Sequence, residues 1–130
     1  MEKLQFIELI KKGFNHIPFS REIVVDTDTA LALYLKLANS PYSYFLESVQ
    51  GGEKWGRYSF IGLTAETVIK VNDYEVKVEK NGVLVEQYVV EDPLEWIENY
   101  QNQFNVPKLD DLPDFNGGLV GYFGYEIIRY

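Results

Sequence analysis

The chain is poor in residue types on which whole classes of protein depend. Among its 130 residues there is no cysteine, one histidine and one methionine. The absence of cysteine excludes disulfides, thiolate metal sites and cysteine nucleophiles. A single histidine, His16, cannot build a metal cluster by itself. We therefore expect no metal site in this chain.

Positive charge and long apolar runs are also scarce. Twelve Lys and Arg face 20 Asp and Glu, so the formal net charge is -8. Nucleic acids and anionic membrane surfaces both require clustered basic residues, so neither is an expected partner. No apolar run approaches the ~20 residues that span a bilayer, and charges recur through the first twelve residues, unlike a secretory signal. The sequence predicts a cytoplasmic protein.

Three segments have the pattern of an α-helix. Apolar residues recur at helical spacing across residues 2–12. Residues 30–37, rich in Ala and Leu, follow a cluster of good N-cap residues. A third helix opens at Asp92, as N-cap, and Pro93, at the first helical position, and keeps its apolar period to Phe104.

Strand patterns fill much of the remaining chain. The Asn81-Gly82 pair is a strong hairpin signal, and Asn72-Asp73 predicts a second turn. Glycines alternate with large apolar residues over residues 117–124, which is typical of a strand that a neighbour approaches closely. We expect an α+β fold in a single domain, 1–130, with about three helices and a largely antiparallel sheet of about six to seven strands. The other predicted strands are residues 20–25, 42–48, 57–63, 67–71, 75–80 and 83–89.

Catalytic constellations are not apparent. His16 stands in a predicted loop with no Ser and Asp placed beside it. Glu95 and Glu98 share a helix face, and exposure of that face to solvent is enough to explain the two carboxylates. The glycines of residues 51–54 lie between two strands, so they lack the setting of a phosphate-binding loop. We assign no catalytic residue.

One constellation suits the binding of a zwitterion. Glu47 and Ser48 end an aromatic strand, a glycine-rich loop follows, and Arg57 begins the next strand. Glu47 or main-chain carbonyls could hold an ammonium group, and Arg57 with free N–H groups could hold a carboxylate. Strand ends beside polar loops are common, so the residues alone leave an ordinary loop as the alternative.

Two blocks of the sequence resemble a known family. The first is Phe45-Leu46-Glu47-Ser48 followed by residues 51–62, Gly-Gly-Glu-Lys-Trp-Gly-Arg-Tyr-Ser-Phe-Ile-Gly, with Pro41-Tyr42 upstream. The second is residues 117–126, Gly-Gly-Leu-Val-Gly-Tyr-Phe-Gly-Tyr-Glu. The residues of the two blocks and the order of the blocks resemble the N-terminal region of anthranilate synthase component I, a family of chorismate-utilising enzymes.

The resemblance implies a function for the parent enzyme. Members convert chorismate and ammonia to anthranilate and pyruvate with Mg²⁺, and a glutamine amidotransferase subunit delivers the ammonia. L-tryptophan inhibits allosterically from a pocket in the N-terminal part. The family's Leu-Glu-Ser motif falls on Leu46, Glu47 and Ser48, and a basic residue of the same site falls on Arg57.

The sequence departs from the family pattern mainly in length. The chorismate and Mg²⁺ sites belong to a C-terminal catalytic domain, and the Pro-Ser-Pro-Tyr-Met-type segment that completes the tryptophan pocket is not in this chain. Phe45 replaces a usual Leu, which is a conservative change. We expect a fragment with half of the regulatory site, no cofactor and no activity alone, and Tyr130 is not its natural end.

Three other interpretations remain open at this stage. The nearest is the N-terminal part of aminodeoxychorismate synthase component I, which shares the scaffold. The second is a stand-alone amino-acid-binding module, and the third is a structural interaction domain that binds no ligand.

Overall fold

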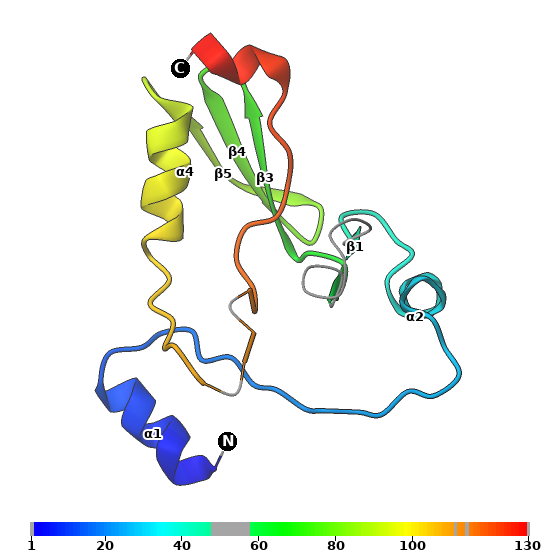
Figure 1. The fold of residues 1–130 in the computed structure, drawn as a ribbon. Helices are drawn as coiled ribbons and strands as arrows, with labels where there is room; N and C mark the ends of the chain where they lie inside the picture. The colour runs from blue at the N-terminus through cyan, green and yellow to red at the C-terminus, as the bar shows by residue number, and fades with distance from the viewer. Residues whose placement is uncertain (1, 48–57, 111, 114, 130) are drawn as a thin grey trace. The chain divides into compact units, whose positions relative to one another are not determined.

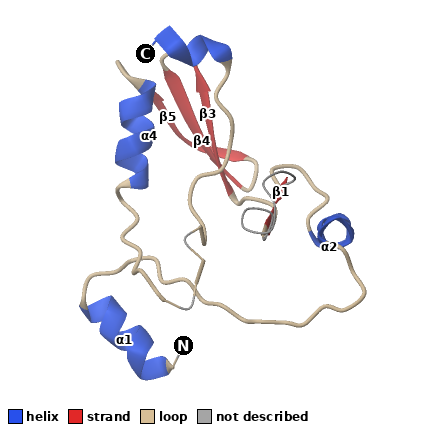
Figure 2. Ribbon diagram, viewed as in Figure 1, coloured by secondary structure: helices blue, strands red, loops and turns tan. Residues whose placement is uncertain are grey.

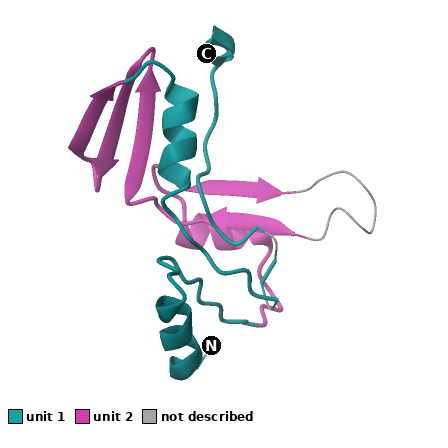
Figure 3. Cartoon of the chain, turned by 90° about the vertical axis from the view of Figure 1, so that its left-hand side faces the viewer, with its two compact units in different colours: residues 1–23, 90–130 teal, residues 24–89 magenta. Residues whose placement is uncertain are grey.

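The computed structural model describes residues 2–47, 58–110, 112–113 and 115–129. Within these residues the fold is α+β, with three α-helices, a short 3-10 helix and antiparallel sheets of two and three strands (Figures 1 and 2). The predicted fold class is therefore confirmed. The chain divides into two compact units, which Figure 3 colours separately. We call residues 24–89 the continuous unit, and residues 1–23 with 90–130 the split unit.

The continuous unit contains one helix and all five strands. Helix α2 spans Ala30–Leu37. Strands β1 (Tyr44–Glu47) and β2 (Ser59–Gly62) pair antiparallel in a two-stranded sheet, which we call the β1–β2 ribbon. The second sheet has the order β3-β4-β5. Its strands are β3 (Thr67–Asn72), β4 (Glu75–Lys80) and β5 (Val83–Val89).

Strand β4 lies at the centre of the three-stranded sheet. Two of its side chains, Val76 and Val78, are 0% and 1% exposed, and their polar neighbours alternate with them. The hairpin to β5 turns on Asn81 and Gly82, whose φ angles of 50° and 77° are those that a two-residue hairpin turn prefers. The Asn81-Gly82 hairpin is thus confirmed. The turn from β3 to β4 falls one residue later than predicted, at Asp73 and Tyr74.

The split unit joins the beginning and the end of the chain through two asparagines. It contains helices α1 (Lys3–Lys11) and α4 (Pro93–Gln101) and the 3-10 helix η1 (Tyr125–Arg129). The Asn15 side chain donates to Gln103 O (2.6 Å) and accepts from Asn105 N–H (2.7 Å). The Asn105 side chain donates to Gly13 O (3.0 Å). These bonds hold the segment after α1 beside the segment after α4.

Two predicted strands are wrong. Residues 20–25 and 117–124 form no ladder with any described strand, so the sheets contain five strands rather than six or seven. Ile23 and Val24 are 70% and 82% exposed. β-Branched residues stabilise a strand only where a neighbouring strand packs against them. Gly117 and Gly118, at φ 148° and 130°, adopt backbone conformations outside the usual strand region.

The three predicted helices are confirmed, and their ends have identifiable causes. Asp92 caps α4, because its Oδ1 accepts from the N–H groups of Leu94 (2.8 Å) and Glu95 (3.1 Å). The helix ends at Gln101, before the predicted Phe104. Phe104 nevertheless packs against the helix, since its ring centroid lies 5.4 Å from that of Tyr100.

The described helices are short. None is long and apolar enough to cross a membrane, the longest having nine residues. Within the same residues, no three His, Asp or Glu side chains gather closely enough to hold a metal ion.

The cap of α4 gives a test of local stability. Asp92→Ala leaves two helix N–H groups without their acceptor, so the free energy of unfolding should fall by about 1 kcal/mol. Asp92→Ser keeps an oxygen acceptor, so this variant should retain most of the free energy of unfolding that Asp92→Ala loses. Urea unfolding followed by circular dichroism measures both. Equal losses in the two variants would show that the loss of stability does not come from the missing cap.

Candidate functional site

The described part of the predicted site lies at the end of strand β1. Leu46 and Glu47 are its last two residues, and they pair with Phe60 and Ser59 of β2. Neighbouring side chains in a strand point to opposite faces, so Leu46 and Glu47 leave the β1–β2 ribbon on opposite sides. Both are exposed. A ligand that touches both side chains must therefore lie across the end of the ladder.

The face that carries Leu46 is aromatic. Phe60 stands opposite Leu46, and Tyr58 stacks on Phe60 with ring centroids 6.3 Å apart. Tyr58 is 59% exposed and Leu46 is 48% exposed. This surface is suited to the flat apolar body of an aromatic ligand.

The opposite face carries the carboxylate of Glu47. Its Oε1 accepts from the hydroxyl of Ser59 at 3.4 Å, a long contact. A carboxylate has about four acceptor positions, so the contact with Ser59 uses only part of the capacity of Glu47. A charged donor such as an ammonium group forms the stronger, charge-assisted hydrogen bonds with a carboxylate.

Ser48 and Arg57 lie outside the described residues. The structure therefore does not test their predicted contacts. The residues that flank them are described, and Glu47 faces Ser59 across the ladder.

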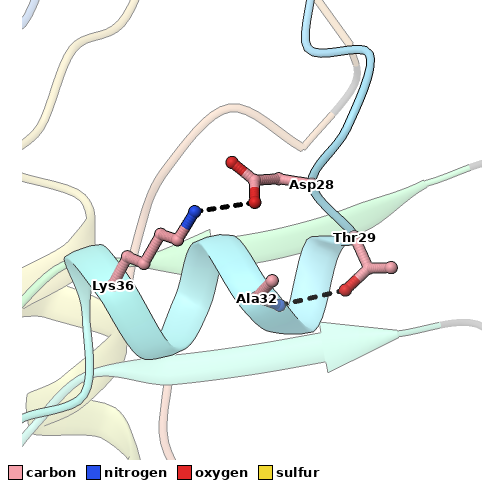
Figure 4. A network of polar contacts seen from close by, with 4 residues as sticks. All are labelled: Asp28, Thr29, Ala32 and Lys36. Atoms are coloured by element: carbon pink, nitrogen blue, oxygen red, sulfur yellow. Dashed lines mark hydrogen bonds and ion pairs between the residues drawn. The ribbon is translucent and has the colours of Figure 1, made fainter.

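Helix α2, which precedes β1 in the chain, contacts the ribbon. Thr29 caps the helix by accepting from Ala32 N–H at 3.1 Å, and Lys36 forms an ion pair with Asp28 at 2.7 Å (Figure 4). The ring of Tyr34 then stacks on Phe45 of β1, with centroids 5.6 Å apart and planes inclined by 25°. The cap and the stacked rings fix the strand that ends in Leu46 and Glu47.

Glycine at position 62 is required by a cross-strand contact. Gly62 pairs with Tyr44, and the tyrosine ring lies over the glycine. A Cβ added to Gly62 would clash with atoms of that ring. The pair therefore closes the end of the ribbon that lies away from Leu46 and Glu47.

A second polar cluster links β1 to the three-stranded sheet. Lys70 of β3 donates to both carboxylate oxygens of Glu79 of β4, each at 2.8 Å. Its ammonium also lies 5.5 Å from the ring centroid of Tyr42, two residues before β1. The hydrogen bond to Glu79, with a smaller contribution from Tyr42, raises the pKa of Lys70 above its ordinary value of 10.5. Sequence reasoning missed this cluster because its members are far apart in the chain.

A cavity of about 660 Å³ lies within the split unit, between residues 16–18 and residues 101–119. Its lining is mostly apolar, and of the described residues of the predicted site neither Leu46 nor Glu47 contributes to it. His16 borders it, with its ring edge-on to Phe104 at 4.7 Å. His16 is exposed.

The contact between Gly62 and Tyr44 predicts a clash. Gly62→Ala should lower the free energy of unfolding by about 1–3 kcal/mol, as expected for overpacking. Adding Tyr44→Ala should remove the clash, so the double variant should lose less than the sum of the two single losses. Gly121→Ala is the matched control, because no atom lies within 4 Å of its added Cβ. Additive losses would contradict the contact.

The raised pKa of Lys70 predicts a dependence on alkaline pH. A raised pKa means that the ion pair stabilises the fold fully below pH 10.5 and that this stabilisation is lost as pH rises through the folded-state pKa. Arginine stays charged at such pH. The thermal midpoint of the unsubstituted protein should therefore fall below that of Lys70→Arg only above pH 10.5. In a Glu79→Gln background that difference should vanish.

Comparison with known proteins identifies relatives along the whole chain. No family profile and no solved structure matches it. Anthranilate synthase component 1 of Pseudomonas putida is 52% identical over 130 residues, all of this chain and 26% of that protein. The proteins of the same name from Neisseria gonorrhoeae and Acetivibrio thermocellus are 50% and 38% identical over 98% of the chain, again 26% of each relative. At this identity along its whole length, the chain belongs to the anthranilate synthase component 1 family, and it spans about a quarter of the length of the relatives that it matches.

Proposed function

We propose that this chain is the N-terminal regulatory part of an anthranilate synthase component I and that it carries half of a tryptophan feedback site. The parent enzyme converts chorismate and ammonia to anthranilate and pyruvate in the cytoplasm. The chain itself contributes no catalytic residue and is inactive alone. L-tryptophan, the end product of the pathway, is the ligand.

The observation that carries the proposal is the exposed end of strand β1. Leu46 presents an aromatic face with Phe60 and Tyr58, and Glu47 presents a carboxylate on the other side. A flat apolar body with an ammonium group fits across such an end. The match to proteins named anthranilate synthase component 1 supports tryptophan as that ligand.

Each site residue has a role in the proposal. The indole ring of tryptophan lies against Leu46, and the ammonium group of tryptophan pairs with Glu47. Ser48 binds the amino-acid head group through its hydroxyl, and Arg57 pairs with the carboxylate. The ligand bridges the end of the ladder because Leu46 and Glu47 point to opposite faces.

Feedback inhibition then follows from differential binding. Tryptophan inhibits the enzyme only if it binds a low-activity conformation more tightly than the active one. The short β1–β2 ribbon is the element whose arrangement tryptophan would favour. A C-terminal catalytic domain of the same polypeptide completes the pocket and receives the change.

The Mg²⁺ of the parent enzyme does not fit the described residues of this chain. They contain no group of three His, Asp or Glu side chains that could hold a metal ion. The proposal therefore assigns Mg²⁺ and chorismate to the catalytic domain. The name component 1 implies a second component, and we propose that a glutamine amidotransferase is that partner.

The proposal is tested in the full-length enzyme. Ser48→Phe should raise the tryptophan concentration for half-maximal inhibition by about tenfold or more, which corresponds to losing a coupling of 1–3 kcal/mol, and should spare turnover. Ser20→Phe, an equally bulky change at an exposed position of the split unit, is the control. Anthranilate fluorescence measures the rate.

Three results would contradict the proposal. Unchanged inhibition of Ser48→Phe would remove Ser48 from the site. A full-length enzyme that tryptophan does not inhibit would remove the regulatory role. A full-length enzyme that forms aminodeoxychorismate instead of fluorescent anthranilate would be an aminodeoxychorismate synthase component I.

A further inference from the structure

The turn that leads into strand β1 contains an unusual residue. Ser43 N–H donates to Ser40 O at 3.3 Å and closes a four-residue turn with Pro41 second and Tyr42 third. Tyr42 has a φ of 59°, in the left-handed region. A turn of this pattern ordinarily takes Gly or Asn at the third position, since a bulky side chain is strained there.

The surrounding residues hold Tyr42 in this conformation. The hydroxyl of Ser43 also donates to Ser40 O, at 2.7 Å. The hydroxyls of Ser40 and Thr64 are in contact. Tyr42 O accepts from Ala65 N–H at 3.0 Å. The strained turn is thus tied to the segment that leaves β2.

The ring of Tyr42 makes the second connection. Lys70 Nζ lies 5.5 Å from its centroid while it donates to both oxygens of Glu79. Lys70 and Glu79 lie diagonally across the β3–β4 pair, since Glu79 pairs with Val68, two residues before Lys70. The ring therefore connects the β1–β2 ribbon to the three-stranded sheet through one cation.

We infer that Tyr42 is a positioning residue that sets the orientation of the β1–β2 ribbon and, through it, the sensitivity of the enzyme to tryptophan. The inference rests on the proposed function, because it concerns the same site. Tyr42 does not touch the ligand. It acts through β1, whose last residues, Leu46 and Glu47, form the described part of the site.

The physical reason lies in the size of the ribbon. It has two strands and four residue pairs, and two-stranded sheets are marginally stable by themselves. Tyr42 stands four residues before Leu46, so a change of backbone angle at Tyr42 swings the site end of the strand. A left-handed tyrosine persists only where its surroundings stabilise it, and here the Lys70 contact requires the ring.

Two substitutions separate the ring from the backbone conformation. Tyr42→Asn keeps a residue that tolerates the left-handed region but loses the ring. Tyr42→Phe keeps the ring and loses the hydroxyl, which contributes to the raised pKa of Lys70. In the full-length enzyme, Tyr42→Asn should raise the tryptophan concentration for half-maximal inhibition by about two- to fivefold, the magnitude of an exposed cation–ring contact. Tyr42→Phe, which keeps the ring, should raise it less than Tyr42→Asn.

The cation is tested in the same way. Lys70→Met should reproduce the effect of Tyr42→Asn, and combining the two should add nothing, because both remove one contact. Lys70→Arg, which can pair with Glu79 and lie over the ring, should keep the sensitivity of the enzyme to tryptophan. Turnover without tryptophan should stay the same in every variant, which distinguishes positioning from loss of structure.

The outcomes separate this inference from the proposed function. Normal inhibition in Tyr42→Asn and Lys70→Met, alongside lost inhibition in Ser48→Phe, overturns the positioning role alone. Loss of turnover in both variants also overturns it, since the contact would then be structural. If the unsubstituted enzyme is not inhibited by tryptophan, the proposed function fails before Tyr42 is considered.

Discussion

The four residue pairs between β1 and β2 are the interaction on which the candidate site depends. A ladder this short has little stability of its own, so the chain surrounds it with specific contacts. Tyr44 covers Gly62 within the ladder, and Tyr34 of α2 stacks on Phe45. Tyr42 connects the start of β1 to the three-stranded sheet. Aromatic rings make each of these contacts, which accounts for part of the chain's richness in tyrosine and phenylalanine.

Local signals predicted most of the fold. Asn81-Gly82 specifies its hairpin through backbone angles, and Asp92 specifies a helix start through an acceptor for free N–H groups, so neither needs distant residues. The failures occur where a strand needs a partner. Residues 20–25 have suitable side chains, but strand formation depends on a neighbour that propensity does not reveal.

The site was predicted through resemblance more than through chemistry. Glu47 at a strand end suggested a zwitterion, but only the family motif singled out Leu46. Register could not be derived from one strand, so the opposite orientations of Leu46 and Glu47 became clear only from the pairing with Phe60 and Ser59. The cluster of Tyr42 and Lys70 was equally hidden, since folding alone brings its members together.

The two asparagines of the split unit also bear on how the chain is made. Asn15 and Asn105 are ninety residues apart, and the bond between them needs both. A ribosome releases the N-terminal residues first, and domains generally fold as units during synthesis. Residues 24–89 are complete before Asn105 emerges, so α1 must wait while they form. Asn15 is thus synthesised before residues 24–89 and yet reaches its native contact after them.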